Sequence, residues 1–216
     1  MKQIQPGIFR RDGKIYTRNA VAGEKVYGEP LVEEGGVEYR AWKPSRSKAG
    51  AAVMKGVDLG LEPGSEVLYL GAASGTTVSH FSDILDEGLV VAVEYSDSVA
   101  RDLLALAEQR ENIAPVLGDA RKPEEYADLV EEVDVLFQDI SQKDQPEIFL
   151  KNAERFLKTG GIGLFAVKAR SISTADAREE IFESVKEKLA DRFEILEETE
   201  LDPYEKEHLF LKLRKK

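Results

Sequence analysis

The chain has 216 residues, no cysteine and a formal net charge of −11 at pH 7. This length allows one full domain plus a small additional one, with a core that needs no disulfide or metal. Disulfides, cysteine–zinc sites and thiol nucleophiles are excluded, which suits a soluble protein of the reducing cytoplasm. No apolar run approaches the ~18 residues of a membrane span, and the first residues lack the apolar core of a signal peptide. The acidic charge by itself argues against direct nucleic-acid binding, which normally requires a basic face.

The first forty residues predict a small antiparallel β domain. Short β-prone segments at 7–10, 14–17 and 37–40 are separated by turn formers such as Asp12-Gly13 and Gly35-Gly36. Strands divided by turns in this way predict an antiparallel arrangement rather than a βαβ unit. We place this domain at residues 1–45 and a second domain at residues 46–216, whose first helix is expected at about 47–56.

The second domain alternates strands and helices. The expected strands are 67–70, 89–94, 113–117, 133–138 and 162–167. The expected helices are 76–86, 97–109, a short one from Pro123, 144–157 with a glycine stop at 158–161, and 174–190. Segments beginning at Phe193 and His208 would form a terminal hairpin. This order predicts the α/β class, with a doubly wound, mostly parallel sheet and an antiparallel edge strand.

Residues 66–77 are the stretch around which the domain is organised. The apolar run 67–70 is typical of a strand buried on both faces. Gly71 and Gly75 would let the backbone turn sharply and approach a ligand, and a helix opening near Thr76 would point free N–H groups at it. The dinucleotide fingerprint G-x-G-x-x-G is not met, because Ala73 stands at its second glycine. A tight strand–helix connection without a ligand is the alternative.

Polar residues at the next strand ends favour an adenosyl-type ligand. Glu94 follows Gly75 by close to the ~20 residues expected of a carboxylate that accepts from ribose hydroxyls. Asp119 is placed to accept from an adenine amino group, with Ala120 offering its N–H and Tyr95 packing on the ring. Each of these, taken alone, also fits a polar residue that merely ends a strand.

Asp139 and Lys168 end neighbouring strands and are expected to face the same crevice. A buried lysine beside a carboxylate forms a tuned acid/base pair, although a plain salt bridge fits equally well. Lys48 and His208 lie outside the core βα units, and His208 reads on its own as a polar strand-end residue. We interpret His80, inside the first helix of the sheet domain, as structural.

Seven segments of the chain match one known family in order: 39–52, 69–80 (Tyr-Leu-Gly-Ala-Ala-Ser-Gly-Thr-Thr-Val-Ser-His), 93–96, 118–121, 134–139, 166–171 and 201–208. On these segments the chain resembles the fibrillarin family over nearly its whole length. Lys43 stands where the family usually has Asn, and Ile140-Ser141-Gln142-Lys143 replaces the common Val-Ala-Gln-Pro. The short length, without a Gly/Arg-rich leader, is similar to the archaeal form.

The resemblance implies a Rossmann-like class I methyltransferase that uses S-adenosylmethionine to methylate ribose 2′-hydroxyls in pre-rRNA and tRNA. It also implies a catalytic subunit of the box C/D guide ribonucleoprotein, bound to guide RNA, target rRNA or tRNA, a Nop-domain scaffold protein on the N-terminal β domain, and a kink-turn-binding ribosomal-type protein. No metal is required. The implied catalytic set is Lys48, Asp139, Lys168 and His208. The implied cofactor residues are Gly71, Gly75, Thr76, Thr77, Glu94, Tyr95, Asp119, Ala120, Asp139, Ile140, Ser141 and Gln142.

Three other functions remain open at this point. A small-molecule O-methyltransferase would share the fold, but such enzymes often have a metal-binding acidic cluster or a lid, and neither is evident in the sequence. A cofactor-binding scaffold with a vestigial catalytic set is the reading without enzymatic activity. A nicotinamide reductase is disfavoured by Ala73 and by the antiparallel edge.

Overall fold

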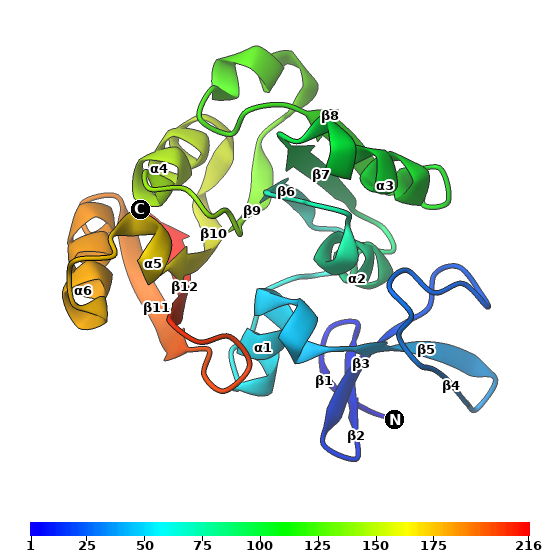
Figure 1. Ribbon diagram of the computed structural model, residues 1–216. Helices are drawn as coiled ribbons and strands as arrows, with labels where there is room; N and C mark the ends of the chain where they lie inside the picture. Colours follow the sequence, from blue (N-terminus) through cyan, green and yellow to red (C-terminus); the bar gives the residue numbers. More distant parts are fainter.

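The computed structural model describes residues 1–216 and places them in two β-sheets (Figure 1). A five-stranded sheet comes from the N-terminal part of the chain, and a seven-stranded sheet with helices on both faces comes from the rest. The first sheet ends at Trp42, and the short 3-10 helix η1 (Pro44–Arg46) leads into the helical part. No helix is both long and apolar enough to cross a membrane.

The first sheet is antiparallel throughout, in the order β1-β2-β3-β5-β4. Its three central strands confirm the predicted segments. The two edge strands were not predicted, because neither has a buried residue and neither carries an apolar run. The strands are β1 (Lys2–Gln5), β2 (Ile8–Arg11), β3 (Lys14–Arg18), β4 (Leu31–Glu34) and β5 (Val37–Trp42).

The second sheet has the order β11-β12-β10-β9-β6-β7-β8. All pairs from β8 to β10 are parallel, and β12 lies between β10 and β11 and is antiparallel to both. The chain proceeds from β6 toward β8 and then returns to β9 on the other side, so the topological switch point lies between β6 and β9. This arrangement confirms the predicted fold class. The strands are β6 (Glu66–Leu70), β7 (Leu89–Glu94), β8 (Ile113–Leu117), β9 (Val133–Gln138), β10 (Leu157–Lys168), β11 (Phe193–Glu200) and β12 (His208–Lys215).

Successive residues of the buried strands point to opposite faces of the sheet and therefore belong to two hydrophobic cores, one on each face. One core packs against α1, α2, α3 and the first sheet, and the other packs against η2, α4 and α6. The carboxyl ends of β6 to β10 are thereby left free along one rim of the sheet. The helices are α1 (Lys48–Met54), α2 (Thr76–Ile84), α3 (Asp97–Ala107), the 3-10 helix η2 (Pro123–Leu129), α4 (Gln145–Phe156), α5 (Ala169–Ile172) and α6 (Arg178–Leu189).

Two predicted boundaries were wrong. The glycine stop at 158–161 is a bulge inside β10, because pairing with β9 begins at Leu157 and resumes at Ile162. Lys158 bridges to Asp134 of β9 at 2.7 Å, which holds the chain at the sheet through the bulge. The helix expected from residue 174 begins only at Arg178, since Ser173 is extended and separates it from α5.

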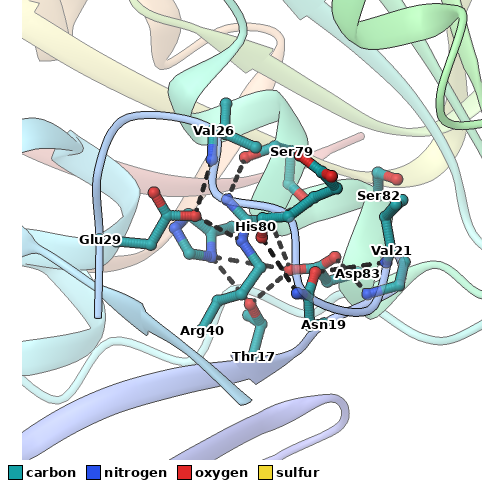
Figure 2. A network of polar contacts seen from close by, with 12 residues as sticks. Thr17, Asn19, Val21, Val26, Glu29, Arg40, Ser79, His80, Ser82 and Asp83 are labelled. Carbon is teal, nitrogen blue, oxygen red and sulfur yellow. Dashed lines mark hydrogen bonds and ion pairs between the residues drawn. The ribbon is translucent and has the colours of Figure 1, made fainter. Parts of the chain in front are cut away.

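A buried polar network joins the first sheet to α2 (Figure 2). Arg40 of β5 bridges Glu29 at 2.7 Å and Asp83 of α2 at 2.8 Å, and all three side chains are fully buried. Asp83 also accepts from Arg110 at 2.7 Å and from the Thr17 hydroxyl at 2.7 Å. Because each buried charge has an opposite partner, the network fixes the orientation of the first sheet on α2.

His80 of α2 belongs to this junction, in keeping with the structural role interpreted from the sequence. Its ring stacks on Trp42 with centroids 4.9 Å apart and contacts the hydroxyls of Thr17 and Tyr27 at 2.8 Å. Burial lowers the pKa of His80 well below its ordinary value, and the positive charges of Arg40 and Arg110 lower it further. The imidazole is therefore neutral near pH 7, and it packs between α2 and the N-terminal sheet.

Candidate active site

The turn after β6 approaches the end of β9 so closely that only glycine fits at position 71. Gly71 has a φ of +82°, and a Cβ atom there would lie 2.3 Å from the carbonyl oxygen of Asp139. Ala73 has a φ of +49°, so the backbone between the strand and α2 is tightly coiled. The bare backbone at Gly71 forms one wall of a cleft at the switch point.

This cleft has a volume of about 240 Å³ and opens at the carboxyl ends of β6 to β9. Most of the predicted cofactor residues line it. The lining comprises Gly71, Ala73, Val93, Glu94, Tyr95, Gly118, Asp119, Ala120, Arg121, Asp139, Ile140, Ser141, Gln142 and Ile148.

Gly75, Thr76 and Thr77 lie outside that lining. Gly75 packs against α3, where an added Cβ would lie 2.4 Å from a methyl carbon of Leu106. Thr77 is buried and donates its hydroxyl to Ser47 at 2.9 Å, and Thr76 lines a separate groove on the other side of the turn. Gly75 and Thr77 therefore hold the start of α2 between α1 and α3 and do not line the cleft.

Glu94 is held rigidly at the edge of the cleft. Its two carboxylate oxygens accept from the backbone N–H groups of Ala73 and Ser96, each at 2.8 Å. Each oxygen keeps a second lone pair, so the side chain is able to accept from hydroxyl groups in the cleft. Tyr95 follows it and is 72% exposed at the rim, where its ring offers a flat apolar surface.

The opposite wall carries an arginine that sequence reasoning missed. Arg121 donates to Gln142 at 2.6 Å and to Asp144 at 3.0 Å, and its backbone N–H donates to Asp119 at 2.9 Å. It thereby ties the segment after β8 to the segment after β9. The signal available in the sequence was its position directly after Asp119-Ala120, two residues already assigned to the site.

Asp139 directly follows β9, lines the cleft and contacts Lys48, the first residue of α1. Their side chains form an ion pair at 3.5 Å. Burial raises the pKa of Asp139, and the positive charge of Lys48 opposes that rise. Ser47 caps α1 by accepting from the N–H of Gly50 at 3.1 Å. This contact fixes the start of α1 and with it the backbone of Lys48.

Lys168 and His208 lie opposite each other in the pairing of β10 with β12. Lys168 donates to the Ser141 hydroxyl at 3.5 Å. His208 is buried and its Nδ1 contacts the carbonyl oxygen of Lys206 at 2.8 Å. Because a carbonyl only accepts, the proton is assigned to Nδ1, which leaves Nε2 as the acceptor nitrogen.

The predicted pair of Lys168 with Asp139 does not form. The two strands are neighbours, as expected. The carboxylate of Asp139 forms its ion pair with Lys48, however, and the ammonium of Lys168 donates to Ser141. Reasoning from strand ends alone left out α1, which brings a second lysine over the rim. Glu205, in the loop before His208, was also missed and lies 3.7 Å from the Lys48 ammonium.

A doubly wound sheet with this strand order, and with a cleft at its switch point between a held carboxylate and a lysine-rich corner, defines a Rossmann-like methyltransferase. The fibrillarin family model matches residues 2–216. The chain therefore belongs to the fibrillarin family, as the sequence resemblance predicted.

Individual relatives agree with this assignment. A fibrillarin-like rRNA/tRNA 2′-O-methyltransferase of Thermococcus onnurineus is 50% identical over 97% of this chain and 96% of its own. The fibrillarin structure solved as a fibrillarin/Nop5p complex superposes with a TM-score of 0.93 at 44% identity, covering 100% of both chains. Aeropyrum pernix fibrillarin, solved with natively bound S-adenosyl-L-methionine, has a TM-score of 0.87 at 44% identity and covers 93% of this chain and 88% of its own.

Proposed function

We propose that this protein is an S-adenosylmethionine-dependent methyltransferase that modifies ribose 2′-hydroxyl groups in rRNA and tRNA. The observation that carries the proposal is the continuity of two features. The cleft between β6 and β9 ends at Asp139, and Asp139 is the residue to which Lys48 is bound, with Lys168 and His208 on the adjoining strands. The cleft proposed for the cofactor and the basic residues proposed to contact the RNA therefore lie on either side of one carboxylate, that of Asp139.

The cleft residues fit the cofactor. Glu94 would accept from the ribose hydroxyls, the backbone at Gly71 leaves room that any side chain would fill, and Asp119 with Ala120 offers one acceptor and one donor for adenine. Asp139 supplies a negative charge for a positively charged ligand. When bound, S-adenosylmethionine supplies an electrophilic methyl group on a sulfonium.

The residues around Asp139 then act on the acceptor. A ribose hydroxyl becomes a strong nucleophile only as its proton leaves, and attack requires alignment at close range. Lys168, which has no ion pair and faces the cleft residue Ser141, is placed to steer or accept that proton. Lys48 and His208 orient the hydroxyl and the neighbouring phosphate.

We further propose that the protein acts inside a guide ribonucleoprotein. Guide RNA would select the target by base pairing, and a kink-turn-binding protein and a Nop-domain scaffold would hold the RNA. A net charge of −11 supports this division of labour, because such a chain repels free RNA. The N-terminal sheet, residues 1–45, is the proposed docking surface for the scaffold, a partner class found with the relative solved as a fibrillarin/Nop5p complex.

The test is methyl transfer in the reconstituted particle. The protein is combined with scaffold, kink-turn protein and a box C/D guide RNA, and labelled methyl is followed into the guided nucleotide of a target RNA. The expected product carries the label on the 2′-oxygen, and a target with a 2′-deoxy nucleotide at that position accepts none. Transfer to a small hydroxylated aromatic by the protein alone, with none to RNA, would overturn the proposal in favour of a small-molecule O-methyltransferase.

A further inference from the structure

The loop between β11 and β12 places the carboxylate of Glu205 beside Lys48, one of the proposed catalytic residues. Glu205 has no role in the function proposed above. Glu205 lies 3.7 Å from the Lys48 ammonium, which also lies 3.5 Å from Asp139. The three side chains are similarly shielded, at 24%, 24% and 22% exposure for Glu205, Lys48 and Asp139. One lysine is therefore shared by two carboxylates, one of which, Asp139, lines the cleft.

Several contacts fix the backbone that carries Glu205. Leu201 is fully buried, its N–H donates to the carbonyl of His208 at 3.0 Å, and its own carbonyl accepts from the N–H of Glu205 at 3.1 Å. Lys55, directly after α1, donates to the carbonyl of Asp202 at 3.0 Å. Figure 1 shows the loop, in orange to red, beside α1. Glu205 is thus presented to Lys48 from a fixed position.

We propose that Glu205 is a positioning residue for methyl transfer, acting through Lys48. This inference rests on the function proposed above. A lysine ammonium is a point charge on a flexible four-carbon stem, so one partner at 3.5 Å leaves it many positions. A second carboxylate, on a separate element, restricts the ammonium to the region between the two and keeps it from closing fully on Asp139.

This role differs from a contribution to stability. Partly exposed ion pairs add little to the free energy of unfolding. Misplacement of a catalytic group by about 1 Å, in contrast, reduces a rate by as much as ~100-fold. Loss of Glu205 should therefore slow methyl transfer and leave folding and cofactor binding nearly unchanged.

The experiment compares Glu205→Gln, Glu205→Asp and the control Glu207→Gln in the complete particle. Glu207 belongs to the same loop and also holds an ion pair, but to Arg170 at 2.9 Å rather than to Lys48. Single-turnover methyl transfer, the Kd for S-adenosylmethionine and the urea unfolding of the isolated protein are measured for each. Each Glu205 variant is then repeated in a Lys48→Ala background.

We expect Glu205→Gln to slow single-turnover transfer by roughly tenfold or more, Glu205→Asp to recover part of the rate, and Glu207→Gln to match wild type. The Kd and the unfolding transition should stay close to wild type, and Glu205→Gln should have no further effect once Lys48 is alanine. A wild-type rate for Glu205→Gln, or an equal loss in the Lys48→Ala background, would overturn the role. An inactive wild-type particle would instead overturn the proposed function, and this role with it.

Discussion

Lys168 of β10 and His208 of β12 stand directly opposite each other in the antiparallel ladder that borders the catalytic corner. They are neighbours because β12 lies between β10 and β11 and is antiparallel to β10, which places the first residue of β12 beside the last residue of β10. With Asp139 directly after β9 and Lys48 on α1, the four residues of the proposed catalytic set come from four separate parts of the chain. Three of those residues lie at strand ends, where the sheet holds them rigidly.

Lys168→Ala should abolish most methyl transfer and spare cofactor binding. Positioned proton transfer contributes about 10²–10⁴-fold to a rate, so we expect single-turnover transfer to fall by at least ~100-fold. The Kd for S-adenosylmethionine should remain close to wild type, because Lys168 lies beside the cleft lining rather than in it. Lys158→Ala, at the other end of the same strand, is the control and should transfer normally. Full turnover by Lys168→Ala would contradict the assigned role.

Gly71→Ala should destabilise the protein and weaken cofactor binding together. The left-handed backbone at this position costs a residue with a Cβ about 1–2 kcal/mol, and contact with the Asp139 carbonyl adds to that cost. Urea unfolding and cofactor titration measure the two effects. Gly64→Ala, two residues before β6 and with open space around it, is the matched control and should behave as wild type in both. Equal behaviour of the two variants would remove the steric argument for the turn.

Asp83→Ala should loosen the junction between the two sheets. Removing the carboxylate leaves Arg40 and Arg110 buried without their shared partner, and breaking such a pair costs about 3–5 kcal/mol. Urea unfolding should show that loss, whereas Asp86→Ala, an exposed residue just after the same helix, should change little. A loss below ~1 kcal/mol would mean that apolar packing alone holds the first sheet in place.

Asp139→Asn should abolish methyl transfer without reducing stability at neutral pH. Burial raises the pKa of Asp139 above the ordinary value near 3.9. Between these two pKa values the folded state binds more protons than the unfolded state, so the wild-type free energy of unfolding falls as pH rises through that window. Asn has no such dependence, and Lys48 keeps Glu205 as a partner in the variant.

We therefore expect Asp139→Asn to be at least as stable as wild type at about pH 7, with the advantage shrinking toward about pH 4. Paired urea unfolding curves across this range provide the measurement. A variant that is clearly less stable at neutral pH would show that Asp139 stabilises the fold, contrary to the direction of its pKa shift.

The sequence was most informative where residues are buried on both sides. The bounds of β7, β8 and β9 were predicted to the residue, because an apolar run between polar strand ends has few other interpretations. The edge strands β1 and β4 were missed because they contain no buried residue and therefore no such apolar run. The family resemblance supplied Lys48 and His208, which periodicity alone could not relate to the rim of the sheet.

What sequence reasoning could not supply was the pairing among charged side chains. Lys168 was expected on Asp139 because their strands are neighbours, but which lysine reaches a carboxylate depends on how α1 packs over the rim. Glu205 sits in a charged loop that looks like any solvated connection. Glu205 reaches Lys48 because the loop between β11 and β12 packs beside α1, and this tertiary contact leaves no pattern in the sequence.

The measurement that tests the central claim most directly is the crystal structure of this protein with S-adenosylmethionine. The account predicts the adenosyl group in the cleft between Gly71, Glu94 and Asp119, with the methyl-bearing sulfur beside Asp139 and the methyl directed toward Lys168 and His208. A cofactor bound elsewhere, or bound in the cleft with its methyl directed away from these side chains, would contradict it.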